Sequence, residues 1–153
     1  MTGKEYADRI ASYIVAHYGD RGLRVYREIT LGKTIIGKSR KVDLFVLHEP
    51  SNRAMAIECK YQEGPGTVDE KIPYAMDDLE ALPVPGWIVY AGGGFSKGVV
   101  HLLEASPVAA RCLPEPSLER GGTTWELDHA LAIVFHWWDV IIGGRKAHAA
   151  ERM

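Results

Sequence analysis

The stretch Lys41-Val-Asp-Leu-Phe-Val-Leu47, followed by Arg53-Ala-Met-Ala-Ile-Glu-Cys-Lys60, decides the fold of this chain. In the first stretch, apolar residues alternate around an acid, and the second ends with an acid and a lysine two positions apart. Between them, His48-Glu-Pro-Ser-Asn52 consists of residues that favour turns. The pattern predicts two strands joined as an antiparallel hairpin.

This hairpin brings two acids face to face. If its centre lies between Pro50 and Ser51, Asp43 falls directly opposite Glu58. Two carboxylates that face each other across a ladder repel, so a site that keeps them usually holds a cation between them. Because side chains of a strand alternate between its faces, Lys60 lies on the same face as Glu58, one step along. The sequence therefore predicts a metal site with a positive charge beside it.

This arrangement resembles the motif of the PD-(D/E)XK nuclease superfamily, which has the restriction-endonuclease-like fold. The family motif is an acid on one strand, a variable hairpin loop, and then an acid, any residue and a lysine on the next strand. Here it reads Asp43 and then Glu58-Cys59-Lys60, with Val42 where the family name has a proline that varies widely. The strand ending Glu-Cys-Lys-Tyr-Gln62 is also similar to that of many bacterial and phage members.

The resemblance implies a role for each residue of the motif. Asp43 and Glu58 would hold Mg²⁺ or Mn²⁺, with the main-chain carbonyl of Cys59 and water molecules completing the coordination. Lys60 would orient the attacking water or help to deprotonate it, and would stabilise the developing charge. Gln62, on the same face if the strand continues, would position water or phosphate.

Members of this family often add an acid from the first helix to the metal site. Glu5 is the candidate that the resemblance implies, although its angle lies off the apolar stripe of the predicted helix. Glu28, on the first predicted strand, is the rival. The sequence leaves open which of the two acids completes the site.

Three interpretations of this site follow. The resemblance implies a metal-dependent DNA nuclease, expected to be an endonuclease of a restriction-like, phage or junction-resolving kind. The alternative is a non-catalytic nucleic-acid-binding or assembly module on the same fold. The complete set of Asp43, Glu58 and Lys60 favours the enzyme, because degenerate members usually lose one of the three. An ordinary cross-strand ion network is disfavoured, since facing acids are a poor way to build a strand pair.

A net charge of −2 argues against a protein that coats nucleic acid through bulk positive charge. DNA contact needs only a local basic stripe, and residues 32–41, which lead into Asp43, supply one. This segment is either a solvated hairpin end or a set of phosphate contacts. A second glycine-rich turn, Gly92-Gly-Gly94, lacks the ending of a nucleotide-binding loop and favours a tight connection. The candidate DNA-binding residues are Lys33, Lys38, Arg40, Lys41 and Lys97.

The rest of the chain predicts an α/β fold: an α/β/α layered core with a central mixed β-sheet flanked by helices. The expected order is helix, three strands, helix, strand, helix and strand, as in the family core. We assign residues 1–113 to the nuclease-like core and 114–153 to a linker and C-terminal helix, within a single domain. The elements around the hairpin are expected at 5–18 (helix), 23–31 (strand), 68–82 (helix, N-cap Thr67), 86–91 (strand), 96–105 (helix) and 108–113 (strand).

The C-terminal part contains a strongly apolar predicted helix over residues 125–142. It is too short and too polar at its start to span a membrane, so it must bury its surface against protein. One interpretation is a homodimer, which would present two sites to a duplex, and the other is packing on the chain's own sheet. His129, His136 and Asp139 lack the pattern of a zinc site, and residues 143–153 are expected to form a frayed tail.

The two cysteines, Cys59 and Cys112, make neither a disulfide framework nor a thiolate zinc site. The polar N-terminus enters a helix directly and does not resemble a signal peptide. The expected location is therefore a reducing cytoplasm, bacterial or phage-infected.

Overall fold

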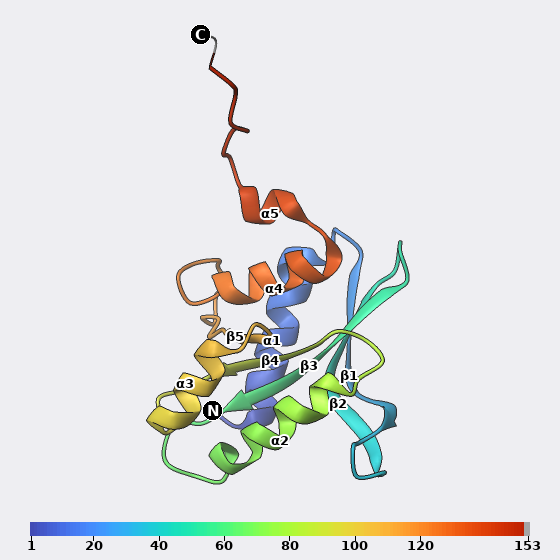
Figure 1. The fold of residues 1–153 in the computed structure, drawn as a ribbon, viewed down its shortest axis with the longest axis vertical. Coiled ribbons are helices and arrows are strands. Elements are labelled where there is room, and N and C mark those ends of the chain that lie inside the picture. Colours follow the sequence, from blue (N-terminus) through green and yellow to red (C-terminus); the bar gives the residue numbers. More distant parts are fainter. Residues whose placement is uncertain (152–153) are drawn as a thin grey trace.

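The computed structural model describes residues 1–151, and Figure 1 shows its helices and strands in the predicted order, followed by two further helices. The hairpin strands and the central strand lie within one or two residues of their expected bounds. The elements are α1 (Gly3–Tyr18), β1 (Leu23–Lys33), β2 (Ser39–His48), β3 (Arg53–Tyr61), α2 (Val68–Glu80), β4 (Gly86–Ala91), α3 (Lys97–Ala105), β5 (Ala109–Arg111), α4 (Trp125–Phe135) and α5 (Trp138–Ile142).

The strands form one mixed sheet in the order β1-β2-β3-β4-β5. β2 pairs antiparallel with β1 and β3, whereas β3, β4 and β5 run parallel. The parallel connections pass through α2 and α3, because parallel neighbours cannot be joined by a tight turn. β4 lies between two strands and is buried on both faces, which explains its continuous apolar sequence.

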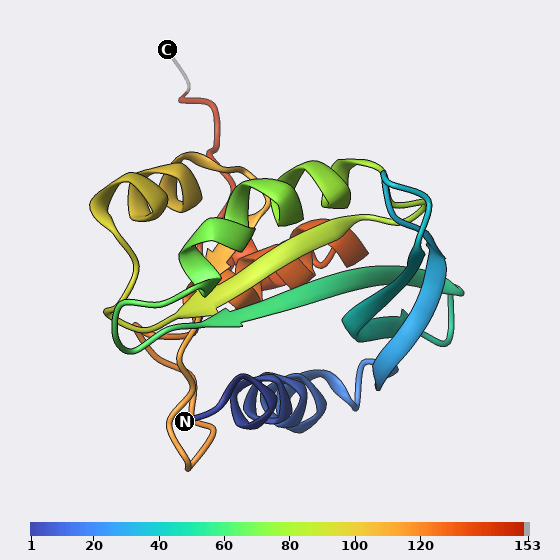
Figure 2. The same ribbon diagram turned by 90° about the horizontal axis from the view of Figure 1, so that it is seen from below.

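Helices cover both faces of this sheet, which confirms the predicted α/β/α layering. Figure 2 shows α1 on one side of the sheet and α2 and α3 on the other. α1 and α4 share the larger apolar core with the sheet, and α2 and α3 share the smaller one. The buried residues of α1 recur at helical spacing, so they form one stripe against the sheet. They are Tyr6, Ala7, Ile10, Tyr13, Ile14 and Tyr18.

The hairpin of β2 and β3 has the predicted register. Leu44 pairs with Ile57 and His48 pairs with Arg53, as expected for the predicted turn centre. Leu44 and Ile57 are fully buried in the core that α1 covers. Because side chains alternate along a strand, the neighbouring Asp43 and Glu58 point to the opposite face, where α2 lies. The period of two thus separates the apolar side of the hairpin from its acidic side.

The predicted single helix over residues 125–142 is wrong, because the structure divides it into α4 and α5. His136 between them has a left-handed backbone with φ 63°, which ends α4. The break turns Trp137 back onto the domain, where its ring stacks on Tyr18 at a centroid distance of 5.5 Å. The buried residues of α4 are Leu127, Asp128, Ala130, Leu131, Ala132 and Phe135.

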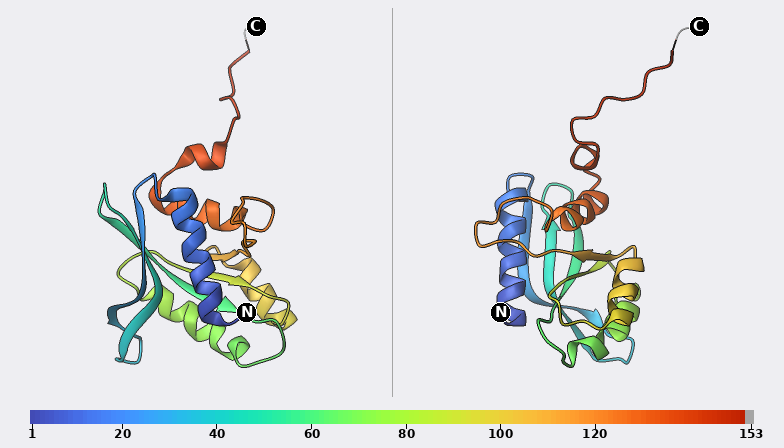
Figure 3. Two further views of the ribbon diagram at one scale, coloured as in Figure 1. Left: turned by 180° about the vertical axis from the view of Figure 1, so that it is seen from behind. Right: turned by 90° about the vertical axis from the view of Figure 1, so that its left-hand side faces the viewer.

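Beyond α5 the chain runs away from the domain (Figure 3), and residues 143–151 contain no helix or strand. The last two residues of the predicted tail, 152 and 153, lie outside the described part of the chain. Among the helices formed within residues 1–151, none is long and apolar enough to cross a membrane.

Candidate active site

The two acids of the hairpin lie where the ladder between β2 and β3 ends. Its last pair is Leu44 with Ile57, one position before the acids. There the backbone N–H of Cys59 donates a hydrogen bond to Asp43 Oδ2 at 2.8 Å, so the carboxylate takes the place of a main-chain acceptor. Asp43 is thereby held beside the strand that carries Glu58.

Asp43, Glu58 and Lys60 act on one another electrostatically. Burial, and then the charge of Asp43, raise the pKa of Glu58 to about 8, whereas the ammonium group of Lys60 lowers it. Glu58 and Lys60 are both partly buried on the α2 side of β3. The structure therefore brings together the three side chains that the sequence singled out.

This pair of carboxylates suits a hard divalent cation. Mg²⁺ prefers oxygen ligands and commonly takes one or two carboxylates together with water. Within the described residues 1–151, no group of three or more His, Cys, Asp or Glu side chains is arranged to hold a metal ion. An ion at this place would therefore depend on Asp43 and Glu58, with main-chain or water oxygens as its other ligands. The Cys59 thiol is unsuited to this task, because it is buried and burial raises its pKa well above the usual value.

Glu58 and Lys60 open onto a cavity of about 360 Å³ between the sheet and α2. Lys41 of β2 lines the same cavity, and so do Lys71 and Tyr74 of α2. Lys71 and Tyr74 were missed by the sequence analysis. Their spacing of three residues, which sets two helical side chains on one side, was the available signal.

A sequence model of the PD-(D/E)XK nuclease superfamily domain matches residues 2–138. The chain belongs to this superfamily. The match includes the hairpin acids and Lys60, and it extends through α4. Nucleases of this superfamily generally use divalent metal ions, in agreement with the oxygen ligands that Asp43 and Glu58 offer.

Comparison with solved structures finds a repair endonuclease from Pyrococcus abyssi, at 16% sequence identity and a TM-score of 0.38. The likeness covers 67% of this chain and 44% of that one, so this chain spans less than half of the length of that protein. No curated protein matches the sequence. The family assignment therefore comes from the match over residues 2–138.

The two candidates for a third acid of the nuclease site lie in different settings. The Glu5 carboxylate accepts a hydrogen bond from the Thr2 backbone N–H at 3.2 Å, and Thr2 Oγ1 accepts one from the Glu5 N–H at 3.1 Å. This capping box keeps Glu5 at the start of α1. Glu28 falls between the pairs Arg27–Leu44 and Ile29–Val42 of the β1–β2 ladder and has a left-handed backbone with φ 52°. Neither carboxylate joins Asp43 and Glu58 in a metal-holding group in the described chain.

Gln62 is held by the start of α2 and does not line the cavity beside Lys60. Its Nε2 donates a hydrogen bond to the Gly94 carbonyl at 2.8 Å, and its Oε1 accepts one from the Asp69 backbone N–H at 3.2 Å. Gln62 thereby takes up an N–H of the first turn of α2. The predicted N-cap, Thr67, makes no capping hydrogen bond with its side chain.

The five predicted DNA-binding residues fall into two groups, one buried arginine and four exposed lysines. Arg40 is only 4% exposed, and its guanidinium donates to both carboxylate oxygens of Asp78, at 2.8 and 2.9 Å. This contact raises the pKa of Arg40 and lowers that of Asp78. Arg40 thus ties β2 to α2, and its guanidinium is already occupied. The other four predicted residues are exposed: Lys33, Lys38 and Lys41 near the hairpin, and Lys97 at the start of α3.

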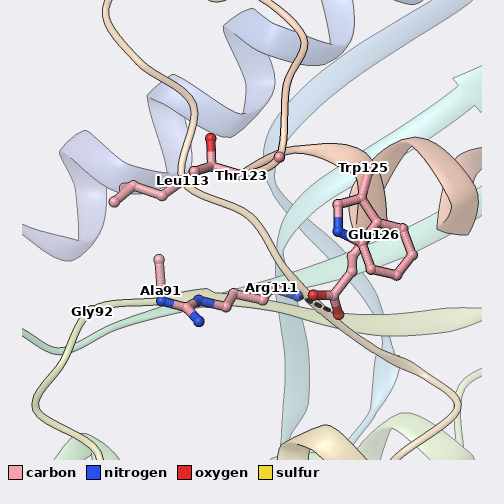
Figure 4. Close-up of a pocket in the computed structure, with 8 residues that line it drawn as sticks. Ala91, Gly92, Arg111, Leu113, Thr123, Trp125 and Glu126 are labelled. Carbon is pink, nitrogen blue, oxygen red and sulfur yellow. Dashed lines mark hydrogen bonds between the residues drawn. The ribbon is translucent and has the colours of Figure 1, made fainter.

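A second cavity, of about 330 Å³, lies at the carboxyl ends of β4 and β5. Figure 4 shows Arg111 lying beside Ala91 and Gly92, with Trp125 and Glu126 approaching from α4. The Arg111 backbone N–H donates to Glu126 Oε1 at 3.3 Å. None of the predicted nuclease residues lines this cavity, so the α2 cavity is the one that belongs to the candidate active site.

Proposed function

We propose that this domain is a Mg²⁺-dependent DNA endonuclease with Asp43, Glu58 and Lys60 as its catalytic residues. The observation that carries the proposal is the position of the two acids at the end of the β2–β3 ladder, with Lys60 on the same face. Facing acids destabilise a strand pair unless a cation lies between them. Membership of the nuclease superfamily supports hydrolysis of a phosphodiester as the reaction.

Each of these side chains has a task in the reaction. Bound Mg²⁺, for which Mn²⁺ is expected to substitute, would supply a Lewis acid that lowers the pKa of a water molecule. Asp43 and Glu58 would hold it, together with the main-chain carbonyl of Cys59. Lys60 would donate a hydrogen bond to the attacking water or to a phosphate oxygen and stabilise the added negative charge. The water oxygen would bond to phosphorus and release a proton to solvent as the bond to the leaving oxygen breaks, and the leaving oxygen would take up a proton from solvent.

Incubation of the purified protein with supercoiled plasmid tests this proposal. We expect nicked or linear DNA with Mg²⁺ or Mn²⁺ and none with EDTA. Lys60→Ala should keep the fold and bind the metal but lose cleavage. If the protein binds DNA but cleaves it with neither Mg²⁺ nor Mn²⁺, the non-catalytic module is the correct assignment. Unchanged cleavage by Lys60→Ala would exclude the proposed site.

Exposed lysines at the turn between β1 and β2 and at the start of α3 are proposed to contact DNA phosphates. Lys33 and Lys38 lie in or beside the turn between β1 and β2, and Lys97 is the first residue of α3. Such contacts add affinity without sequence preference. Replacement of Lys33 and Lys38 by Ala should therefore weaken binding to unrelated DNA sequences by the same factor.

We also propose a homodimer that forms through the C-terminal helices. Trp137 is partly buried in the domain's own core, but Ile133, Trp138 and Ile142 are 46%, 51% and 53% exposed. A two-fold pair would suit cleavage of both strands of a duplex, since it presents two sites in opposite orientations. Light scattering tests this: wild type is expected at twice the chain mass, and Trp138→Ser at the 16.9 kDa of one chain.

A reducing cytoplasm, bacterial or phage-infected, is the proposed location. Both Cys59 and Cys112 are buried free thiols. Disulfides are rare in reducing compartments, so free thiols agree with this location. Fractionation of cells that express the protein would test it.

A further inference from the structure

The cavity between β2, β3 and α2 has more positive than negative charge available to a ligand. Lys41, Lys60 and Lys71 enter it from three different elements. The salt bridges within residues 1–151 include none of these three lysines. An excess of ammonium groups along the wall of a cavity attracts an anion.

The two acids that line the cavity do not cancel this charge. The charge of the Asp78 carboxylate is neutralised by Arg40, whose guanidinium donates a hydrogen bond to each of its two oxygens. Glu58 is the single remaining acid among the residues that line the cavity, and with Asp43 beside it two acids stand against three lysines. In the proposed reaction it would itself be bound to a cation, so the lysines keep their full attraction for an anion.

The same ion pair fixes the wall that carries Lys71. Arg40 belongs to β2 and Asp78 to α2, and the Ile35 backbone N–H also donates to Asp78 Oδ1 at 3.3 Å. Paired charges with two hydrogen bonds and little exposure hold their geometry better than surface ion pairs do. α2 is therefore attached to the sheet, and Lys71 of this helix lines the same cavity as Glu58.

We propose that Lys71 and Lys41 bind the phosphate next to the scissile phosphate of a nucleic acid strand. Lys60 remains beside the acids, while Lys71 and Lys41 clamp the backbone one step away. Lys71 is a positioning residue: it holds the strand and does not touch the reacting atoms. The inference rests on the proposed function, because it takes the Asp43–Glu58 pair as the place of cleavage.

Binding measured without cleavage tests this inference separately. A fluorescent duplex is titrated with the full chain in EDTA, over a series of salt concentrations, and the anisotropy is recorded. Lys71→Ala should weaken binding several-fold at low salt. It should also reduce the slope of log affinity against log salt concentration by about 0.9, the change expected for one lost phosphate contact. Lys71→Arg keeps the charge and should restore both values.

Lys4→Ala is the matched control, because Lys4 is an exposed lysine near the start of α1, which covers the other face of the sheet. Its affinity and salt slope should equal those of wild type. Equal behaviour of Lys71→Ala and Lys4→Ala would overturn the inference. If no metal supports cleavage but Lys71→Ala still loses the contact, the phosphate site stands and only the proposed reaction fails.

Discussion

Two carboxylates border the α2 cavity, and their surroundings are opposite. Asp78 has a guanidinium partner, with both oxygens hydrogen-bonded, and this contact lowers its pKa. Glu58 faces another acid, and burial together with the charge of Asp43 raises its pKa to about 8. The ion pair of Asp78 and Arg40 has a structural role, because it joins α2 to β2. A buried acid next to a second acid lacks a structural explanation, and such sites are where function is expected.

The largest difference between the two carboxylates should appear in cleavage. Asp43→Asn and Glu58→Gln remove one charged ligand each, and we expect cleavage to fall by about 10³-fold or more, in line with the loss of a transition-state-stabilising group. Asp78→Asn should retain cleavage to within about tenfold per folded molecule, because Asp78 has no chemical role. Initial rates on plasmid, measured well below the unfolding midpoint of each variant, decide this. An equal loss of cleavage rate in all three variants would contradict the distinction between catalytic Asp43 and Glu58 and structural Asp78.

The order of the effects should be reversed for stability, where Asp78→Asn is expected to cost more than Asp43→Asn. Asp78→Asn leaves the buried guanidinium of Arg40 without its counter-charge, which should lower the free energy of unfolding by about 3–5 kcal/mol. Asp43→Asn removes a repulsion and should leave the metal-free protein equally stable or more stable. Urea unfolding at neutral pH in EDTA measures both. A loss of stability in Asp43→Asn as large as in Asp78→Asn would contradict the assignment of Asp43 to function.

The acid pair was predictable from the sequence, because the information that sets it is local. A turn at residues 48–52 and a strand period of two fix the register that brings Asp43 opposite Glu58, and the structure has that register. The alternation also separated the apolar side of β2 and β3 from the side of the acids. The fold order followed from the same kind of local pattern.

The ion pair was not predictable, because its partners are 38 residues apart and no periodicity connects them. Arg40 therefore looked like one more residue of a basic stripe. The hydrogen bonds of Gln62 were not predictable for a similar reason, since its amide partners Gly94 and Asp69 come after the chain has turned towards α2. The break at His136 comes with the stacking of Trp137 on Tyr18, a tertiary contact that the helical pattern of the sequence does not contain.

The smallest expected effect is the pH dependence of stability, which should have opposite signs for the two carboxylates. The pKa of Glu58 is raised from 4.5 to about 8 in the folded, metal-free protein. Between these values the folded state binds more protons than the unfolded state, so the free energy of unfolding falls as pH rises. One pKa unit corresponds to about 1.4 kcal/mol, so the fall is a few kcal/mol at most. Asp78, whose pKa is lowered from 3.8, loses its contribution only as pH falls below that value.

Thermal unfolding in EDTA from pH 5 to 8 measures the contribution of Glu58. Glu58→Gln should flatten the decline, because an amide does not titrate. Mg²⁺ should abolish or reverse it in wild type, since the cation binds the ionised carboxylates that a proton would otherwise neutralise. Asp78→Asn should leave the slope in this range unchanged, although its unfolding midpoint is lower throughout. A decline that persists in Glu58→Gln would assign the titration to another group, and the contrast between the two carboxylates would then lose its electrostatic basis.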